Sequence, residues 1–198
     1  MTMANTFEHI RKLYNNTCED IVRSPTVWLN FLGSACYNFR LPFDEQLLIY
    51  AQRPDAKAVL SSWNNRFNRM VNRGAKGIAV VDDSTDNPRL KYYFDISDTS
   101  ERENSKPVPI WKYEDGFKDD VIKTLQNAYD IASDDIYNAV WETSKALVED
   151  NINDYNADLV MCKNDSFLEE LSDDMCESVL RMALQNSVAY MIMARLSL

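Results

Sequence analysis

Histidine and glycine are scarce in this chain, whose 198 residues include one His and four Gly. A Ser-His-Asp or Cys-His catalytic arrangement would have to use His9, and no nucleophile motif lies near it in residues 7–14. We therefore expect His9 on the surface of a helix, and we expect the protein not to be an enzyme. The low glycine content also argues against Gly-rich phosphate-binding loops.

Cysteine is too sparse for a metal or disulfide framework. The four cysteines lie far apart and form no Cys-x-x-Cys pair, so we expect neither a zinc site nor a disulfide. They are better explained as free, mostly buried thiols in a reducing cytosol: Cys18, Cys36, Cys162 and Cys176. We expect no signal peptide, because the first residues are polar where an apolar stretch would lie, and no run approaches the roughly 18 apolar residues of a membrane span. We expect a cytoplasmic protein with no membrane contact, no metal and no cofactor.

The charge of the chain is unevenly distributed. The formal net charge is −10, which at first sight argues against nucleic-acid binding. Residues 1–112, however, contain 15 basic and 13 acidic side chains, a net of +2, whereas residues 113–198 contain 6 and 18, a net of −12. Residues 53–77 contain one acidic side chain, Asp55, and six basic ones. The basic residues are Arg53, Lys57, Arg66, Arg69, Arg73 and Lys76. A local nucleic-acid contact beside a large acidic surface is therefore allowed.

Apolar periodicity and turn residues predict an α+β fold, with N-terminal helices, a small antiparallel sheet and a C-terminal acidic helical region. Three helices are expected over residues 5–22, 25–35 and 43–52, and Ser24-Pro25 forms an N-cap and N1 pair for the second. Residues 55–68 are expected to form a short helix or turn. We expect residues 1–112 to form the α+β region and residues 113–198 to pack on it, or both to form one continuous domain.

The sheet is expected around residues 69–96. Residues 69–71 and 77–81 are strand-like and joined by a turn at 73–77, and residues 90–96 follow an Asp-rich loop at 82–88. Residues 97–109 are expected to be a loop, followed by an edge strand at 110–113.

The region from Gly116 onward is expected to be helical, and its strongest signal is a stripe with steps of four and three. The stripe consists of Met175, Val179, Met182, Asn186, Ala189 and Met193. Its methionines are typical of an adaptable binding surface, but core packing is the interpretation that we favour.

Paired carboxylates are frequent, and they leave three interpretations open. Such pairs can bind magnesium or perform acid–base chemistry, but these lie at loops and helix starts, where the helix dipole already favours them. Collectively they could present a phosphate-like field to a basic groove of another protein, or they could form a solvated face. The pairs are Asp82-Asp83, Asp119-Asp120, Asp134-Asp135, Glu169-Glu170 and Asp173-Asp174.

The segment Arg66–Gly77 alternates cations with apolar residues and ends in a turn bracketed by Gly74 and Gly77. Such a turn lets backbone N–H groups and Lys76 approach phosphates, although both glycines could serve turn geometry alone. The nearby Trp63, Phe67 and Tyr50 could stack on unpaired bases, but Trp63 fits a core position better.

Three runs of residues resemble the N-terminal ArdC-type domain: 43–56, Trp63-Asn64 and 71–80. That domain occurs in antirestriction proteins and in large helicase- or methylase-like proteins of conjugative elements, where it is associated with single-stranded DNA binding. The resemblance implies that certain residues contact DNA or define the fold: Gln46, Gln52, Trp63, Arg69, Arg73, Lys76 and Gly77. Arg53 and Arg66 of the basic stretch complete the expected nucleic-acid site. With one His, the chain cannot contain the His-Glu-x-x-His protease part of that family, and the helicase and methylase parts are also missing.

Some relatives of this domain look like anti-CRISPR proteins that act on type II RNA-guided nucleases. The resemblance and the charge distribution lead us to expect a non-enzymatic anti-defence protein of a mobile element. Its partners would be a CRISPR effector nuclease with guide RNA, and DNA, whose engagement or cleavage it obstructs. The alternative is a single-stranded-DNA-binding module of a conjugative-element protein. A metal-dependent enzyme that uses the acidic pairs is a third, weaker hypothesis.

Overall fold

A computed structural model describes residues 3–82 and 88–198 and has an α+β architecture. The chain separates into two compact units, Met1–Trp111 (unit 1) and Lys112–Leu198 (unit 2). The boundary expected from the sequence, after residue 112, lies one residue later. Unit 1 contains 14 basic and 13 acidic side chains, a net of +1, and unit 2 contains 7 and 18, a net of −11. The division of charge therefore coincides with a structural division.

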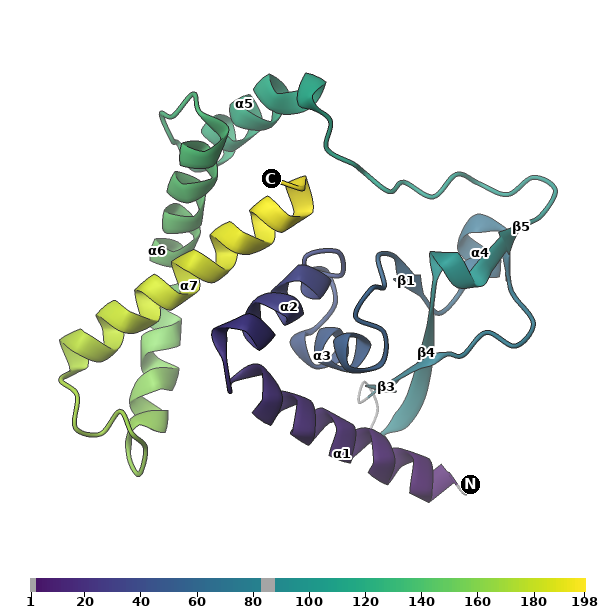
Figure 1. Cartoon of the computed structure of the whole chain (residues 1–198), viewed down its shortest axis with the longest axis horizontal. Coiled ribbons are helices and arrows are strands. Elements are labelled where there is room, and N and C mark those ends of the chain that lie inside the picture. The colour runs from purple at the N-terminus through teal and green to yellow at the C-terminus, as the bar shows by residue number, and fades with distance from the viewer. Residues whose placement is uncertain (1–2, 83–87) are drawn as a thin grey trace. The chain divides into compact units, whose positions relative to one another are not determined.

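Unit 1 begins with the three predicted helices: α1 (Met3–Ile21), α2 (Pro25–Ala35) and α3 (Phe43–Gln52) (Figure 1). Ser24 caps α2, because its hydroxyl accepts a hydrogen bond from the Val27 N–H at 3.3 Å. His9 lies on the exposed surface of α1, as predicted. The core of unit 1 is formed where α1 and α3 meet the sheet, and it includes Ile10, Leu48, Ile49, Ile78, Val80 and Tyr93.

The strands form two sheets instead of the single predicted one. The first contains β1 (Val59–Leu60), β4 (Arg89–Asp95) and β3 (Ile78–Asp82) in the order β1-β4-β3, with Ile78 opposite Tyr93. The second sheet pairs β2 (Arg69–Val71) with β5 (Thr99–Glu101). All strand pairs in both sheets are antiparallel. The predicted pairing of residues 69–71 with 77–81 through their connecting turn is therefore wrong.

The chain reversal after β4 explains this error. Asp95 and Asp98 form a capping box around the 3₁₀ helix η1 (Ile96–Asp98), which redirects the chain so that β5 runs back along β2. Residues 97–109 were predicted to be a loop and instead begin with η1 and β5. The edge strand predicted at 110–113 is not formed. The Asp-rich loop predicted at 82–88, with Asp83 of the first acidic pair, falls largely outside the described residues.

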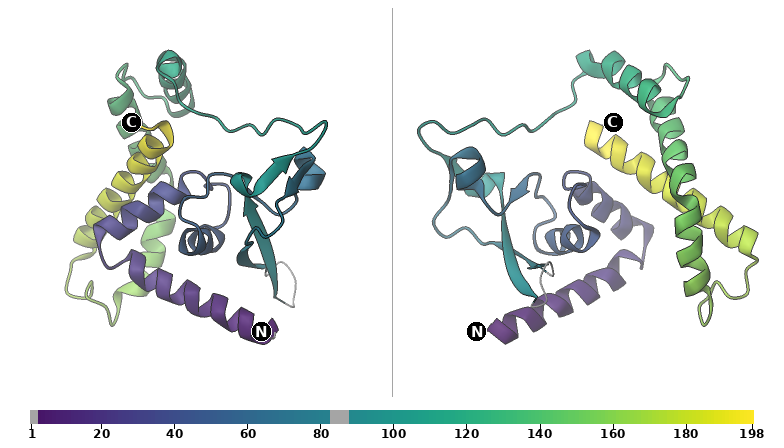
Figure 2. Two further views of the ribbon diagram at one scale, coloured as in Figure 1. Left: turned by 45° about the vertical axis from the view of Figure 1, so that its right-hand side comes forward. Right: turned by 180° about the vertical axis from the view of Figure 1, so that it is seen from behind.

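Unit 2 consists of η2 (Asp115–Phe117) and three helices, α5 (Lys118–Tyr129), α6 (Ile136–Lys163) and α7 (Asp173–Leu196). Helices α6 and α7 pack against each other and cross, as Figure 1 and the right-hand view of Figure 2 show. Helix α5 packs with them, and the core of unit 2 contains Ile122, Ile136, Ala139, Val140, Ala189 and Leu196.

Unit 1 contains one further element, the short helix α4 (Trp63–Phe67).

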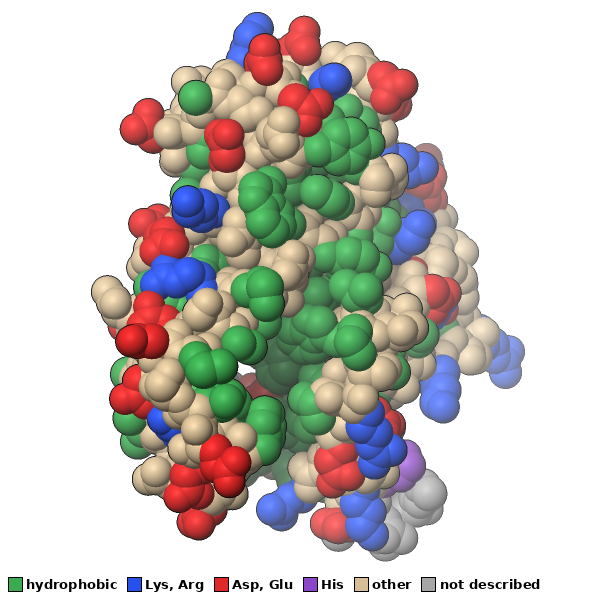
Figure 3. Space-filling model, turned by 60° about the vertical axis from the view of Figure 1, so that its left-hand side comes forward, with side chains coloured by type: hydrophobic (Ala, Val, Ile, Leu, Met, Phe, Trp, Pro, Cys, Tyr) green, Lys and Arg blue, Asp and Glu red, His purple; other side chains and the backbone are tan. Residues whose placement is uncertain are grey.

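The predicted core role of the α7 stripe is correct only for its C-terminal half. Ala189 is buried and Met193 packs against the core of unit 2. Met175, Val179 and Met182 are 54%, 50% and 59% exposed. Figure 3 shows that hydrophobic side chains (green) remain on the surface of the molecule among carboxylates (red).

Candidate nucleic-acid interface

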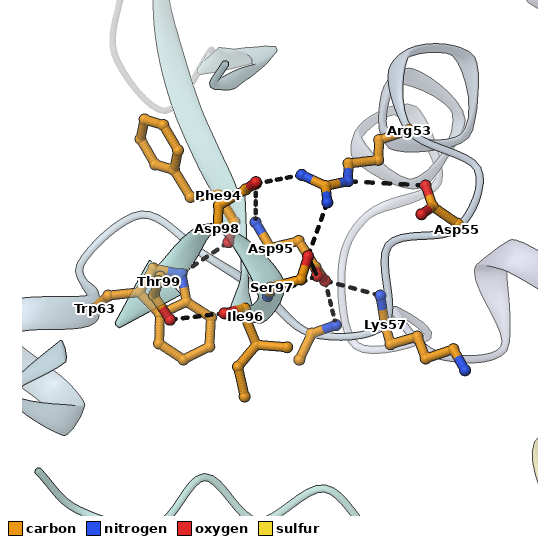
Figure 4. Close-up of polar contacts among 11 residues, drawn as sticks. Arg53, Asp55, Lys57, Trp63, Phe94, Asp95, Ile96, Ser97, Asp98 and Thr99 are labelled. Carbon is orange, nitrogen blue, oxygen red and sulfur yellow. Dashed lines mark hydrogen bonds and ion pairs between the residues drawn. The ribbon is translucent and has the colours of Figure 1, made fainter. Parts of the chain in front are cut away.

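The predicted site residues divide into side chains held inside unit 1 and side chains that are exposed. Arg53 belongs to the first group (Figure 4). Its guanidinium forms an ion pair with Asp98 and donates to the Ser97 hydroxyl at 2.8 Å. The hydrogen bond to Asp98 raises the pKa of Arg53, although partial burial opposes the rise. Arg53 therefore joins the end of α3 to η1 and is not free to bind a phosphate.

Arg69 is also held inside unit 1. Only 9% of the residue is exposed, and its Nε donates to the Thr99 hydroxyl at 2.8 Å. Its Nη1 reaches the Glu101 carboxylate at 2.8 Å, and its Nη2 reaches the Thr99 carbonyl at 3.2 Å. All three contacts lie on β5, so Arg69 holds the β2–β5 pair together. Of the two predicted roles, DNA-contacting or fold-defining, this geometry matches the second.

Trp63 is 2% exposed, and its indole Nε1 donates to the Phe94 carbonyl at 2.7 Å. Its ring also packs on that of Phe67, with centroids 5.7 Å apart. The core position that the sequence favours for Trp63 is therefore confirmed, and the alternative, stacking on unpaired bases, is incompatible with a ring enclosed by unit 1.

Both predicted glutamines bond to backbone groups. Gln46 donates to the Leu41 carbonyl at 2.6 Å. The Gln52 amide donates to the Ala79 carbonyl at 2.8 Å and accepts from the Ala79 N–H at 3.0 Å. Because β3 is an edge strand of its sheet, Gln52 satisfies backbone groups that a further strand would otherwise pair.

We expect Gln52→Met to lower the free energy of unfolding by about 1–3 kcal/mol, because it removes both partners of the buried Ala79 backbone. Methionine has nearly the same shape but cannot replace the two hydrogen bonds. Urea denaturation followed by circular dichroism measures the loss. The control is Gln185→Met on α7, which removes the same kind of side chain at a site far from β3 in the chain. It should lower the free energy of unfolding by less than about 0.5 kcal/mol. Equal stability of the two variants would contradict this role of Gln52.

Three predicted cations are exposed: Arg66, Arg73 and Lys76. Arg73 and Lys76 form no ion pair with any described residue, and Arg66 lies over the Phe67 ring at 5.7 Å. The turn that carries Arg73 and Lys76 is closed by a hydrogen bond from the Ala75 N–H to the Asn72 carbonyl at 3.1 Å. Gly74 has a φ of +87°, a conformation that side chains other than glycine rarely adopt.

An exposed aromatic ring outside the set of residues expected from the sequence lies beside this turn. Tyr92 on β4 is 45% exposed, and a Cβ placed on Gly77 would lie 3.1 Å from the Tyr92 ring. Gly77 therefore serves close packing as well as the turn. Because neighbouring residues of a strand face opposite sides, Tyr92 points away from the side on which Tyr93 is buried. We call Arg73, Lys76 and Tyr92 the turn cluster.

Two further exposed cations lie near Arg66. Arg102 donates to the Asn64 side chain of α4 at 3.0 Å, and the Lys106 N–H donates to the Phe67 carbonyl at 2.9 Å. We call Arg66, Arg102 and Lys106 the α4 cluster. The register of Arg69 opposite Glu101 places this cluster at one end of the β2–β5 pair and the turn cluster at the other. Three strand residues separate the ends by about 10 Å.

A separate cavity of about 350 Å³ lies in unit 1 and is lined by α1, α3 and β3. Phe7, Ile10 and Leu48 make it largely apolar. The Tyr14 hydroxyl donates to the Asp44 carboxylate at 2.6 Å, which raises the Tyr14 pKa. The cavity is also lined by one basic and one further acidic side chain, Arg11 and Glu45.

Three of the acidic pairs lie where helix geometry explains them, whereas Glu169-Glu170 lies in the turn between α6 and α7. Asp135 caps α6 by accepting from the Tyr137 and Asn138 N–H groups at 3.1 and 3.0 Å. Asp119-Asp120 and Asp173-Asp174 occupy first helical turns. Among residues 3–82 and 88–198, no three His, Cys, Asp or Glu side chains form a group that could hold a metal ion. The four cysteines are free thiols, but only Cys36 and Cys176 are buried.

No family model, curated protein or solved structure matches this chain. The resemblance to the ArdC-type domain therefore rests on the residues quoted above and remains a proposal. No helix in the described part of the chain combines the length and apolar character needed to cross a membrane.

Proposed function

We propose that this protein is a non-enzymatic anti-defence protein that binds DNA and an RNA-guided CRISPR nuclease, and so obstructs engagement or cleavage of the target. The observation that carries the proposal is the division of charge between the two units: +1 in unit 1 and −11 in unit 2. A protein with this division offers different surfaces to an anion and to a basic protein.

Unit 1 supports the DNA contact through its two clusters. Lys76 and Arg73 project from a turn without an acidic residue between positions 71 and 77, so their charge is not neutralised locally. The adjacent Tyr92 ring offers an exposed aromatic face on which an unpaired base can stack. A single strand with splayed bases matches this combination of cations and ring better than a closed duplex does.

Unit 2 supports the protein contact through its excess of carboxylates. A nuclease that holds a guide–target duplex does so in a positively charged channel. An acidic helical surface is electrostatically complementary to such a channel and competes there with nucleic acid. The ArdC-type resemblance supports the same assignment, since some relatives of that domain look like inhibitors of type II nucleases.

The deciding experiment is a cleavage assay with a guide-loaded type II nuclease and a labelled target duplex. The protein is added either before or after the target, and cleavage is followed over time. Inhibition that is strong before target addition and weak afterwards supports obstruction of DNA engagement. The proposal fails if micromolar protein leaves cleavage unchanged and the nuclease does not retain the protein in a pull-down.

A second function, a single-stranded-DNA-binding module of a conjugative-element protein, is favoured by the turn cluster alone. It requires unit 1 to bind oligonucleotides in the absence of any nuclease. Binding that is strong without a nuclease, combined with no inhibition of cleavage, would favour this module over the nuclease inhibitor.

For either function, we expect the triple variant Arg66→Ala, Arg73→Ala and Lys76→Ala to bind single-stranded DNA at least about tenfold more weakly at 0.1 M salt. The slope of log K against log salt concentration, where K is the binding constant, should become shallower by about two. Each lost phosphate contact on a single strand contributes roughly 0.7 to this slope. Fluorescence anisotropy with a labelled oligonucleotide measures both quantities.

The matched control removes three exposed cations elsewhere in unit 1: Lys12, Arg23 and Arg89. It changes the net charge equally, so a local site predicts a much smaller loss of affinity. Arg69 is left intact in both variants because it holds β5. Equal losses in the two triple variants would show that the clusters are not the binding site.

A further inference from the structure

The apolar stripe of α7 is covered along only half of its length. Its C-terminal part, Ala189 and Met193, packs in the core that α5 and α6 complete. Its N-terminal part is solvent-exposed, with Met175, Val179 and Met182 each at least 50% exposed. The same helical face thus continues from a packed region into an unpartnered one.

Spacing places the three exposed residues together. Positions 175, 179 and 182 follow each other by four and three residues, so their side chains lie on one face of the helix. With Asn186, which is also exposed, this face extends about 17 Å along α7, or three turns. We call Met175, Val179 and Met182 the open stripe. Methionine at such positions adapts to partners of different shape.

The surroundings of the open stripe are acidic and their cations are already used. Residues 154–182 contain eight Asp and Glu but only two basic residues, Lys163 and Arg181. Lys163 bonds to Asp173 at 2.6 Å, and Arg181 bonds to Glu177 at 2.6 Å and forms an ion pair with Glu149. In the described residues, Asp174 and Glu170 form no ion pair. Asp174, the neighbour of Met175 in α7, thus adds unpaired negative charge beside the open stripe, and residues 154–182 carry a net charge of −6.

We propose that the open stripe of α7 binds a basic amphipathic helix presented by a partner protein. Apolar residues of that helix, spaced by three and four, would cover Met175, Val179 and Met182, and its Lys or Arg side chains would meet the acidic border. A second copy of this chain would bring the same acidic border against itself, and an anionic membrane would be repelled in the same way. This inference rests on the proposed function in one respect, namely that unit 2 contacts a basic protein.

The test uses the full chain with ¹³C-labelled methionine methyl groups and an 18-residue probe peptide. The peptide has Leu at positions spaced i, i+3, i+4 and i+7, and Lys elsewhere. We expect saturable shifts of the Met175 and Met182 methyl signals, while Met70 and Met161, which are 47% and 81% exposed, stay unchanged. A peptide with Leu replaced by Gln, and one with Lys replaced by Glu, should each bind at least tenfold more weakly.

The double variant Met175→Gln and Met182→Gln should lose at least tenfold in peptide affinity, while Met161→Gln, at another exposed methionine, retains the parent affinity. Both keep the fold intact, since all three side chains are on the surface. The assay contains neither nuclease nor DNA, so it can fail independently of the cleavage experiment.

Several results would overturn the inference. Equal shifts of all exposed methionines, or no shift, would show that the open stripe is not a binding site. If the peptide with Glu in place of Lys kept its affinity, the partner helix would not need to be basic. Sedimentation that reveals a dimer lost in the double variant would assign the open stripe to a second copy. Methyl contacts between the open stripe and residues of unit 1 in the free protein would assign it to this chain itself.

Discussion

Replacement of Asp95 with alanine is expected to lower the free energy of unfolding by about 4 kcal/mol. Asp95 is 4% exposed, and its carboxylate accepts four hydrogen bonds (Figure 4). They come from the N–H groups of Lys57, Ala58 and Ser97 at 2.9, 3.0 and 3.0 Å, and from the Ser97 hydroxyl at 2.6 Å. Alanine would leave three backbone donors without this partner, and such buried groups cost about 1–3 kcal/mol each.

Chemical denaturation of the parent and two variants measures this effect. Asp95→Asn keeps one acceptor oxygen, so it should cost about half as much as Asp95→Ala. Because Asp95 connects β1 and the segment before it to η1, hydrogen exchange should accelerate at Ala58 and Ser97 before it changes in unit 2. A loss below about 1 kcal/mol for Asp95→Ala would show that the network does not stabilise unit 1 in this way.

The same carboxylate gives the stability a defined dependence on pH. Burial raises the pKa of Asp95, but the hydrogen bonds from Ser97, Ala58 and Lys57 outweigh burial, so the pKa lies below its ordinary value. The unfolded chain therefore binds a proton at this group at a higher pH than the folded chain does. The stabilisation is complete above the ordinary Asp pKa of about 3.9 and is lost as the pH falls through the lower folded value. The stability difference between parent and Asp95→Asn should accordingly be constant from pH 7 to 5 and shrink below pH 4.

The helices of unit 1 could be predicted because their signals are local. Ser24-Pro25 marks a helix start within two residues, and residues 43–52 form α3 as predicted. Strand β5 could not be predicted in this way. Its three residues show no alternation, and they are held by Arg69, which lies 30 residues away from Thr99 in the chain. Long-range contacts of this kind leave no periodic pattern in the sequence.

The candidate site illustrates the same limit. Six cations in residues 53–77 looked equivalent, but Arg53 and Arg69 are held by Asp98 and Glu101, 45 and 32 residues away. Arg73 and Lys76 have no such acidic partner among the described residues. A sequence shows where charges are but not which of them are neutralised by distant residues. Alternation in β4 is misleading here, since it places Tyr92 on the same face as the apolar Leu90 and Phe94, whereas the buried tyrosine is Tyr93.

Trp63→Ala is expected to lower the free energy of unfolding by about 3–5 kcal/mol, the usual cost of removing a buried tryptophan. The indole is enclosed, and its loss also leaves the Phe94 carbonyl without its donor. Trp63→Phe keeps most of the volume and should cost about 1–2 kcal/mol. Thermal unfolding followed by circular dichroism distinguishes these two losses.

Comparison with Tyr92→Ala then separates a fold residue from a nucleic-acid contact. Tyr92 is exposed, so its truncation should change stability by less than about 1 kcal/mol, yet it should weaken single-stranded DNA binding about 5- to 100-fold if a base stacks there. Trp63→Phe, measured at a temperature where it is folded, should bind DNA as the parent does. The opposite result, weak binding by folded Trp63→Phe and unchanged binding by Tyr92→Ala, would require the core around Trp63 to open on binding and would move the site away from the turn cluster.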